Sequence, residues 1–320
     1  MIMDRDRIKI FLITGFLGSG KTTFLNVLLD HYKAEKNFVI ENEYGKESID
    51  AVLVKKNYNQ LFEMNNGCLC CVLDDELLSV LEELISHPEA PDNLFIEASG
   101  VADTGILASV FKRDDIQKFF ELKKIITIVD AENIEDRFNE VVEAERQVSA
   151  AELLIINKMD LINLRYADIL TNRLKTINPF ATIVTATQAS IELGILNDPP
   201  SRNFTDHINS DLPHTSHLKS ILMTFDYPFD MQKLYSILTV SLFLHYHQIY
   251  RIKGFVNLDK EDGKFLIQST GKKLSITKEG EWPEDEPVQS KIVVIGKNIE
   301  RISLERMFNK AYPNKSYSTY

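Results

Sequence analysis

Apolar positions in the first 190 or so residues alternate between short continuous runs and longer stretches with helical spacing. The short runs predict strands at residues 9–14, 38–40, 94–98, 125–129, 153–156 and 183–187. The longer stretches predict helices at residues 21–32, 74–86, 134–148 and 166–177. Runs that are apolar at nearly every position suit strands that are buried on both faces. The alternation therefore predicts an α/β domain with a mostly parallel sheet flanked by helices.

The pattern changes near residue 198. Residues 198–217 are polar, contain proline and show no period, so they are interpreted as a linker. Residues 218–320 return to strand-like runs, with helical spacing at residues 231–242 and 302–311. We expect a first domain over residues 1–197, and a smaller α+β domain after the linker.

A glycine-rich motif, GFLGSGKTT, occupies residues 15–23, directly after a predicted strand and at the start of a predicted helix. It matches the phosphate-binding loop of P-loop proteins in the context which that motif requires. The glycines permit a tight turn whose N–H groups can point at phosphate oxygens. Lys21 can reach the β- and γ-phosphates, and the Thr22 hydroxyl can bind Mg²⁺. The residues expected to contact the nucleotide here are Gly15, Leu17, Gly18, Ser19, Gly20, Lys21, Thr22 and Thr23.

The motif NKMD, residues 157–160, follows another predicted strand. In open α/β sheets ligands bind at such strand ends. The Asp160 carboxylate can accept hydrogen bonds from the N1–H and 2-amino groups of guanine, which adenine lacks. Asn157 can bond the other edge of the base, and the Lys158 side chain can lie over its face. The motif therefore predicts guanine recognition.

A carboxylate at the end of the strand in LFIEASG, Glu97, is expected to hold Mg²⁺ or its water shell. Gly100 leaves room for its N–H to approach the γ-phosphate. Asp50 is a second Mg²⁺ candidate. No motif places a Gln or Arg to orient the attacking water, so slow intrinsic hydrolysis is expected. A capping acid near Asp103 is the alternative interpretation of Glu97.

Charge and composition exclude several classes of function. The net charge is −11, which argues against nucleic-acid and anionic-membrane surfaces. Apolar runs fall short of the ~20 residues that span a bilayer, and the N-terminal segment lacks the pattern of a signal peptide.

The three cysteines, Cys68, Cys70 and Cys71, all lie in the motif NGCLCC. Thiolates are soft ligands suited to Zn²⁺ and similar ions. A C-x-C-C run cannot easily surround one tetrahedral ion, so ligands from elsewhere are expected, with Glu41 and Glu47 among the candidates. Three buried cysteines that pack as small hydrophobic residues are the alternative.

Together these motifs resemble the CobW/YjiA-like family of P-loop GTPases, a group that includes zinc metallochaperones. GFLGSGKTT, ENEYG, NGCLCC, IEASG and NKMD occur in the family's order and approximate spacing. The segments FDYPFD, YRIKGFV and IVVIGKNI resemble its C-terminal domain, and the YjiA-type branch is the most similar.

The resemblance implies a cytoplasmic GTPase that binds Zn²⁺, Co²⁺ or another transition metal, with Cys70 and Glu41 at matching metal-binding positions. It also implies a client metalloprotein as partner, and it leaves open whether the protein forms a homodimer. The family usually has Glu directly after the glycine of ENEYG, whereas this chain has Lys46 followed by Glu47. A cation there weakens metal binding unless Glu47 turns inward.

The sequence thus predicts a GTP hydrolase that couples GTP and Mg²⁺ to binding or delivery of a transition metal, zinc first. Three alternatives stay open at this point. A P-loop small-molecule kinase would use the same phosphate loop. A cobalamin or metalloenzyme maturation GTPase would handle cobalt or another metal. A passive metal buffer would have no working nucleotide site, against which the intact Lys21 and Thr22 argue.

Overall fold

The computed structural model describes residues 6–42, 58–64, 73–87, 89–100, 102–199, 218–284 and 287–313. The chain divides into two compact units, Met1–Asn203 and Phe204–Tyr320. Each unit has its own sheet and its own hydrophobic core, and each is described by itself.

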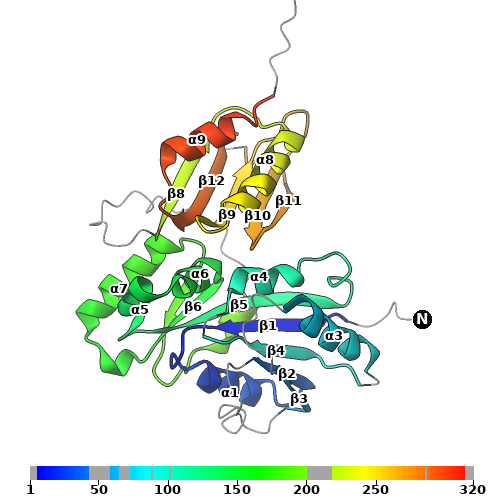
Figure 1. Cartoon of the computed structure of the whole chain (residues 1–320), viewed down its shortest axis with the longest axis vertical. Coiled ribbons are helices and arrows are strands. Elements are labelled where there is room, and N and C mark those ends of the chain that lie inside the picture. The colour runs from blue at the N-terminus through cyan, green and yellow to red at the C-terminus, as the bar shows by residue number, and fades with distance from the viewer. Residues whose placement is uncertain are drawn as a thin grey trace, which may run out of the picture. The chain divides into compact units, whose positions relative to one another are not determined.

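The N-terminal unit is built on a seven-stranded sheet in the order β3-β2-β4-β1-β5-β6-β7 (Figure 1). All neighbouring strands pair in parallel. The central strand is β1, and the chain places later strands on both sides of it. The carboxyl ends of parallel strands share one edge, which is where ligands bind in such sheets. The strands are β1 (Ile8–Thr14), β2 (Asn37–Asn42), β3 (Gln60–Met64), β4 (Asn93–Glu97), β5 (Phe120–Asp130), β6 (Leu153–Asn157) and β7 (Thr182–Thr185).

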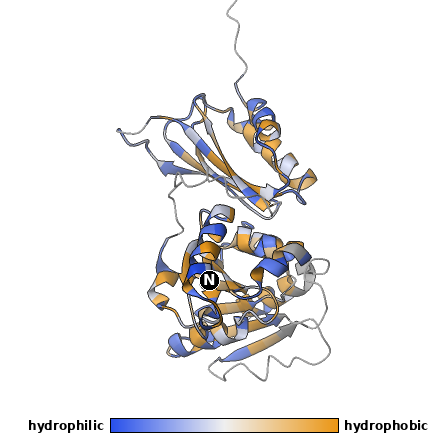
Figure 2. Cartoon of the chain, turned by 90° about the vertical axis from the view of Figure 1, so that its left-hand side faces the viewer, coloured by the Kyte–Doolittle hydropathy of each residue, from blue (hydrophilic) through white to orange (hydrophobic). Residues whose placement is uncertain are grey.

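Helices cover both faces of this sheet, as the sequence predicts. Leucines of α1 pack on one face, whereas those of α3 and α4 pack on the other. Hydrophobic residues run along the strands between these layers (Figure 2). The helices are α1 (Lys21–His31), α3 (Leu73–Ser86), α4 (Thr104–Val110), α5 (Ile134–Glu140), α6 (Val142–Ala150) and α7 (Leu164–Ile177), with short 3₁₀ turns at Met159–Leu161 and Leu193–Asn197.

The single helix predicted over residues 134–148 is wrong, because the structure has two helices there. Val141 adopts extended angles, φ −138° and ψ 130°, which end α5 and begin α6. Apolar spacing continues through the break, so periodicity alone could not reveal it. Strand β3 and helix α4 were not predicted either, since β3 (QLFEM) lacks a continuous apolar run and α4 is too short to show a clear period.

The C-terminal unit is an antiparallel sheet in the order β11-β10-β9-β12-β8. Two helices, α8 and α9, pack on one face of it through leucines and Phe308 (Figure 1). Asp230 begins α8 by accepting a hydrogen bond from the Lys233 N–H. The elements are β8 (Leu218–Phe225), α8 (Met231–Leu244), β9 (Ile249–Val256), β10 (Lys264–Thr270), β11 (Lys273–Gly280), β12 (Ser290–Lys297) and α9 (Arg301–Asn309). Within the described parts of both units, every helix is too short or too polar to cross a bilayer.

One buried side chain, Asn178, holds the end of α6 against the turn between α7 and β7. Its amide donates to the carbonyls of Val148 and Ala151 at 2.7 and 2.9 Å, and its oxygen accepts from the Phe180 N–H at 3.1 Å. Asn178 is fully buried. It therefore satisfies helix-terminal carbonyls that water cannot reach.

We expect Asn178→Ala to destabilise the N-terminal unit by about 2–4 kcal/mol, because it leaves several buried polar groups without partners. Urea unfolding followed by circular dichroism measures this change. Asn172→Ala is the control, since that side chain is exposed on the neighbouring helix. Equal urea midpoints for the two variants would contradict a stabilising role of the Asn178 hydrogen bonds.

Candidate functional site

The loop after β1 lies so close to two neighbouring strand ends that it requires glycine. Gly15, Gly18 and Gly20 have φ of +139°, +76° and +105°. A Cβ on Gly15 would lie 2.4 Å from the Ile128 carbonyl oxygen, and one on Gly20 would lie 2.4 Å from Nδ2 of Asn157. Larger residues would therefore be strained and would collide with neighbouring atoms.

Helix α1 begins directly after this loop, and no side chain caps it. Its N-cap residue is Gly20, so the N–H groups of its first turn have no side-chain acceptor there. Such groups, with the positive end of the helix dipole, favour an anion. Lys21 is 8% exposed and its Nζ donates to the Phe16 carbonyl at 3.4 Å, so its charge is held against the loop.

Thr22 connects the loop to the end of β4. Its Oγ1 donates to Oε1 of Glu97 at 3.0 Å. Glu41, at the end of β2, pairs in register with Glu97, and both carboxylates are more than nine-tenths buried. Residues in register on parallel strands point to the same face. A hydroxyl and a carboxylate in contact are hard oxygen ligands of the kind that Mg²⁺ prefers, so Thr22 and Glu97 fit that ion.

Asn157 ties the glycine loop to the segment that follows β7. Its Nδ2 donates to the Ser19 carbonyl at 2.9 Å, and its Oδ1 accepts from the Ala189 N–H at 2.8 Å. The side chain is buried, so in this geometry it joins loops. Direct bonding of the base by Asn157 stays a prediction.

The next residues of NKMD are positioned by Asp130, at the end of β5. Its carboxylate accepts from Lys158 Nζ at 2.8 Å and from Asn133 Nδ2 at 3.0 Å. Lys158 has a φ of +63°, which turns the chain sharply after β6. Asp160 follows in the short 3₁₀ turn and is exposed, so its carboxylate is accessible to a ligand.

The segment after β7 also belongs to this region, and sequence reasoning missed it. Gln188 and Ala189 both have φ of +55°, and the Met159 N–H donates to the Ala186 carbonyl at 3.1 Å. The only available signal was the position of this segment after the last strand of the parallel sheet. The structure brings it against NKMD.

Helix α6 holds the segment after β4. Nε2 of Gln147 donates to the Gly100 carbonyl at 3.0 Å, and Arg146 forms a 2.7 Å ion pair with Asp103, which caps α4. A Cβ on Gly100 would lie 2.7 Å from the backbone nitrogen of Leu17. The Gly100 backbone therefore packs directly against the glycine loop.

The predicted transition-metal ligands are only partly within the described structure. Cys68, Cys70, Cys71 and Glu47 lie outside the described residues, as does Asp50. Glu41 is described, at the end of β2. Within the described ranges, no group of three or more His, Cys, Asp or Glu side chains could hold a metal ion. The metal site therefore stays a prediction.

Residues 9–185 match the model of the CobW/HypB/UreG nucleotide-binding domain. This chain belongs to that family. Residues 218–312 match the cobW C-terminal domain of cobalamin synthesis proteins.

The similarity of this CobW/HypB/UreG family member to known proteins extends over nearly its whole length. It is 31% identical to the zinc chaperone YjiA of Escherichia coli, over 90% of this chain and 94% of that one. It is 25% identical to the zinc chaperone CobW of Pseudomonas aeruginosa, over 95% and 92% of the two chains. The crystal structure of Zn(II)-bound YjiA GTPase matches with a TM-score of 0.72 and 27% identity, over 97% of this chain and all of that one. The likeness therefore includes both units.

We expect Asp130→Asn to lower the free energy of unfolding at neutral pH. The free energy of unfolding of this variant should also depend less on pH in the acid range. Burial by itself raises the pKa of Asp130, but hydrogen bonds from Lys158 and Asn133 outweigh it and hold the pKa below the ordinary 3.8. The ionised form thus contributes stability that is complete above the unfolded-state pKa and is lost as the pH falls through the lower folded-state value.

Urea unfolding at several pH values between about 2 and 7 measures this dependence. Asp136→Asn is the control, because Asp136 is exposed on α5. An unchanged acid-side slope in Asp130→Asn would show that the ion pair with Lys158 contributes nothing.

Proposed function

We propose that this protein is a GTPase that couples GTP binding and hydrolysis to the binding and delivery of a transition metal, with zinc as the first candidate. The observation that carries the proposal is the contact of Thr22 with Glu97 beside an uncapped α1. Family membership supports it, since relatives are named zinc chaperones and a zinc-regulated GTPase metalloprotein activator.

The phosphates of GTP would lie in the glycine loop against the N-terminus of α1. Lys21 would exchange its contact with Phe16 for the β- and γ-phosphate oxygens, which are stronger, charged acceptors. Thr22 and Glu97 would hold Mg²⁺, with Asp50 as a further ligand outside the described residues. When bound, Mg²⁺ supplies positive charge against the charge of the phosphates.

The Gly100 N–H is assigned to the γ-phosphate end of the site. Gln147 fixes the peptide carbonyl of that glycine, and the close contact with Leu17 keeps the segment against the loop. A segment that touches the nucleotide loop at one glycine is suited to report whether the third phosphate is present. We therefore assign residues 97–100 to a switch.

Guanine selectivity is assigned to Asp160. We expect Asp160→Asn to weaken GTP binding by about 2–4 kcal/mol, because the carboxylate no longer accepts from N1–H and the 2-amino group. Binding of xanthosine triphosphate should change little or improve. Titration calorimetry with GTP, ATP and xanthosine triphosphate measures the selectivity.

The matched control for Asp160 is Asp168→Asn, an exposed aspartate on α7. It should leave all three affinities unchanged. If the wild-type protein binds ATP as tightly as GTP, the guanine assignment is wrong and a small-molecule kinase becomes the better proposal.

Zinc is the proposed cargo, bound by Cys70 with Cys68 or Cys71, Glu41 and Glu47. Strand β3 ends at Met64, which is in register with Asn42, the residue after Glu41. Cys70 is six positions after Met64, a span of at most ~22 Å, so the chain is long enough for a cysteine to reach the edge where Glu41 lies. Thiolates bind metal only when deprotonated, so affinity should fall with pH.

Metal and nucleotide should affect each other, because Glu41 and Glu97 are neighbours in register. We expect GTP with Mg²⁺ to change the Zn²⁺ affinity, and Zn²⁺ to change the GTP affinity by the same factor, as linkage requires. Chelator competition and nucleotide titration, each with and without the other ligand, measure the two factors.

A variant with Ser at Cys68, Cys70 and Cys71 is the control for this linkage. It should lose tight Zn²⁺ binding and keep GTP binding. Equal Zn²⁺ affinity in the wild type and this variant would show that the metal binds at a site without these cysteines. This control is needed because a YjiA GTPase variant with one Glu and two Cys replaced by Ala, to which this chain is similar, was crystallised with Zn(II) bound.

Cobalt handling during cobalamin synthesis is the second candidate, and the match to a cobalamin synthesis C-terminal domain favours it. The same titrations with Co²⁺ in place of Zn²⁺ distinguish the zinc and cobalt proposals. GTP should change the affinity for the cargo metal by the larger factor.

A further inference from the structure

Helix α8 of the C-terminal unit is apolar on its inner side and, in its second half, on its outer side as well. Leu234, Leu238 and Leu242 are fully buried against the sheet. On the outer side Val240 and Leu244 are 55% and 65% exposed. Adjacent apolar side chains on the outer side of a helix are normally covered by a neighbouring element or partner. The outer side of α8 is therefore suited to a contact that the described residues do not make.

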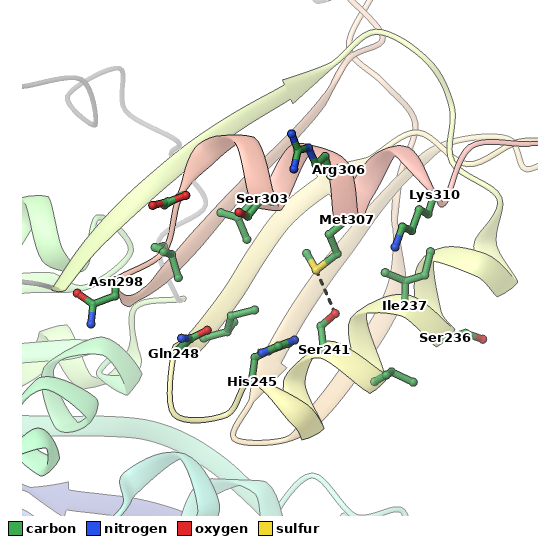
Figure 3. A pocket seen from close by; sticks show the side chains of 15 residues that line it. Ser236, Ile237, Ser241, His245, Gln248, Asn298, Ser303, Arg306, Met307 and Lys310 are labelled. Carbon is green, nitrogen blue, oxygen red and sulfur yellow. Dashed lines mark hydrogen bonds between the residues drawn. The ribbon is translucent and has the colours of Figure 1, made fainter.

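A groove of about 690 Å³ runs along this outer side, between α8 and α9 (Figure 3). Its apolar lining includes Ile237 and Val240 from α8 and Met307 from α9. Leu244 lies four residues after Val240 and seven after Ile237, so helical spacing continues the apolar stripe beyond the groove. Methionine adapts to different partner side chains, which suits a protein-binding groove.

Positive charge borders this stripe on both sides. Arg306 of α9 and Lys310, the residue directly after that helix, line the groove, and neither has an ion-pair partner among the described residues. On the other side, Lys272 Nζ lies 5.2 Å from the ring centre of Phe243. Glu300 also lines the groove, at the opposite end of α9 from Lys310. The cations stand out in a chain whose net charge is −11.

We propose that the groove between α8 and α9 binds an amphipathic helix of another protein whose apolar face is flanked by acidic residues. The apolar stripe would bury the hydrophobic face, and the acidic residues would meet Arg306, Lys310 and Lys272. Helix α8 has 14 residues, which corresponds to about 21 Å, so a partner helix of about four turns matches it. This proposal does not depend on the GTPase assignment.

Charge and shape favour this occupant over an anionic membrane. A net charge of −11 opposes approach to an anionic bilayer, whereas a groove between two helices can enclose a third helix. A second copy of this acidic chain is the other occupant that the experiment must distinguish.

The test uses two fluorescent peptides of about 16 residues, long enough for four helical turns. Both have leucines at helical spacing, flanked by glutamates in one peptide and by lysines in the other. Fluorescence anisotropy with the full chain should give roughly tenfold tighter binding of the acidic peptide at low salt. The double variant Arg306→Glu/Lys310→Glu should reverse this preference, and Val240→Asp should abolish binding of both peptides.

Two control variants match these changes. Lys278→Glu alters an exposed cation on β11, and Leu164→Asp alters an exposed apolar residue on α7. Both should bind the acidic peptide like the wild type. Circular dichroism verifies that every variant folds, and nucleotide turnover should be unchanged in all of them.

Three outcomes would overturn the proposal. The first is equal or absent binding of the two peptides by the wild type. The second is an unchanged preference after the double charge reversal. The third is a dimer in sedimentation velocity that Val240→Asp dissociates, which would assign the groove to a second copy. Cosedimentation with phosphatidylserine vesicles that requires Arg306 and Lys310 would assign the surface to a membrane instead.

Discussion

The close approach of the glycine loop to the ends of β5 and β6 is the constraint on which the rest of the candidate site depends. Gly15 leaves space beside the Ile128 carbonyl, and Gly20 leaves space that Asn157 occupies when it bonds the Ser19 carbonyl. Because the same amide also accepts from Ala189, one buried side chain sets the positions of three loops. The positions of Lys21 and of the base-recognition segment both follow from it.

A second layer of the site connects the phosphate region to the segments that would bind metal. Glu41 and Glu97 end neighbouring strands in register, and Thr22 bonds one of them. Neighbouring buried carboxylates repel each other when both are ionised, unless positive charge is nearby. A cation that arrives at one of them therefore changes the electrostatic free energy of the other, which is a physical basis for coupling metal and nucleotide.

Helix α6 gives the segment after β4 a rigid support. Gln147 and Arg146 are consecutive residues, and they hold Gly100 and Asp103 on the two sides of a short turn. The break at Val141 directs α6 separately from α5, so α6 can lie against α4. The helices of the C-terminal unit differ, because α8 leaves the apolar side chains of Val240 and Leu244 exposed.

The sequence by itself determined the parallel sheet, the glycine loop, the strand-end position of Glu97 and the family resemblance, because these depend on local patterns of burial and on short motifs. It did not determine the break at Val141, since apolar spacing continues across it. It also did not reveal that Asn157 joins loops, that Ala189 lies against it, or that Gln147 holds Gly100. These contacts join residues far apart in the chain. Only the tertiary structure decides them, because a periodic pattern reports which residues are buried but not which neighbours they meet.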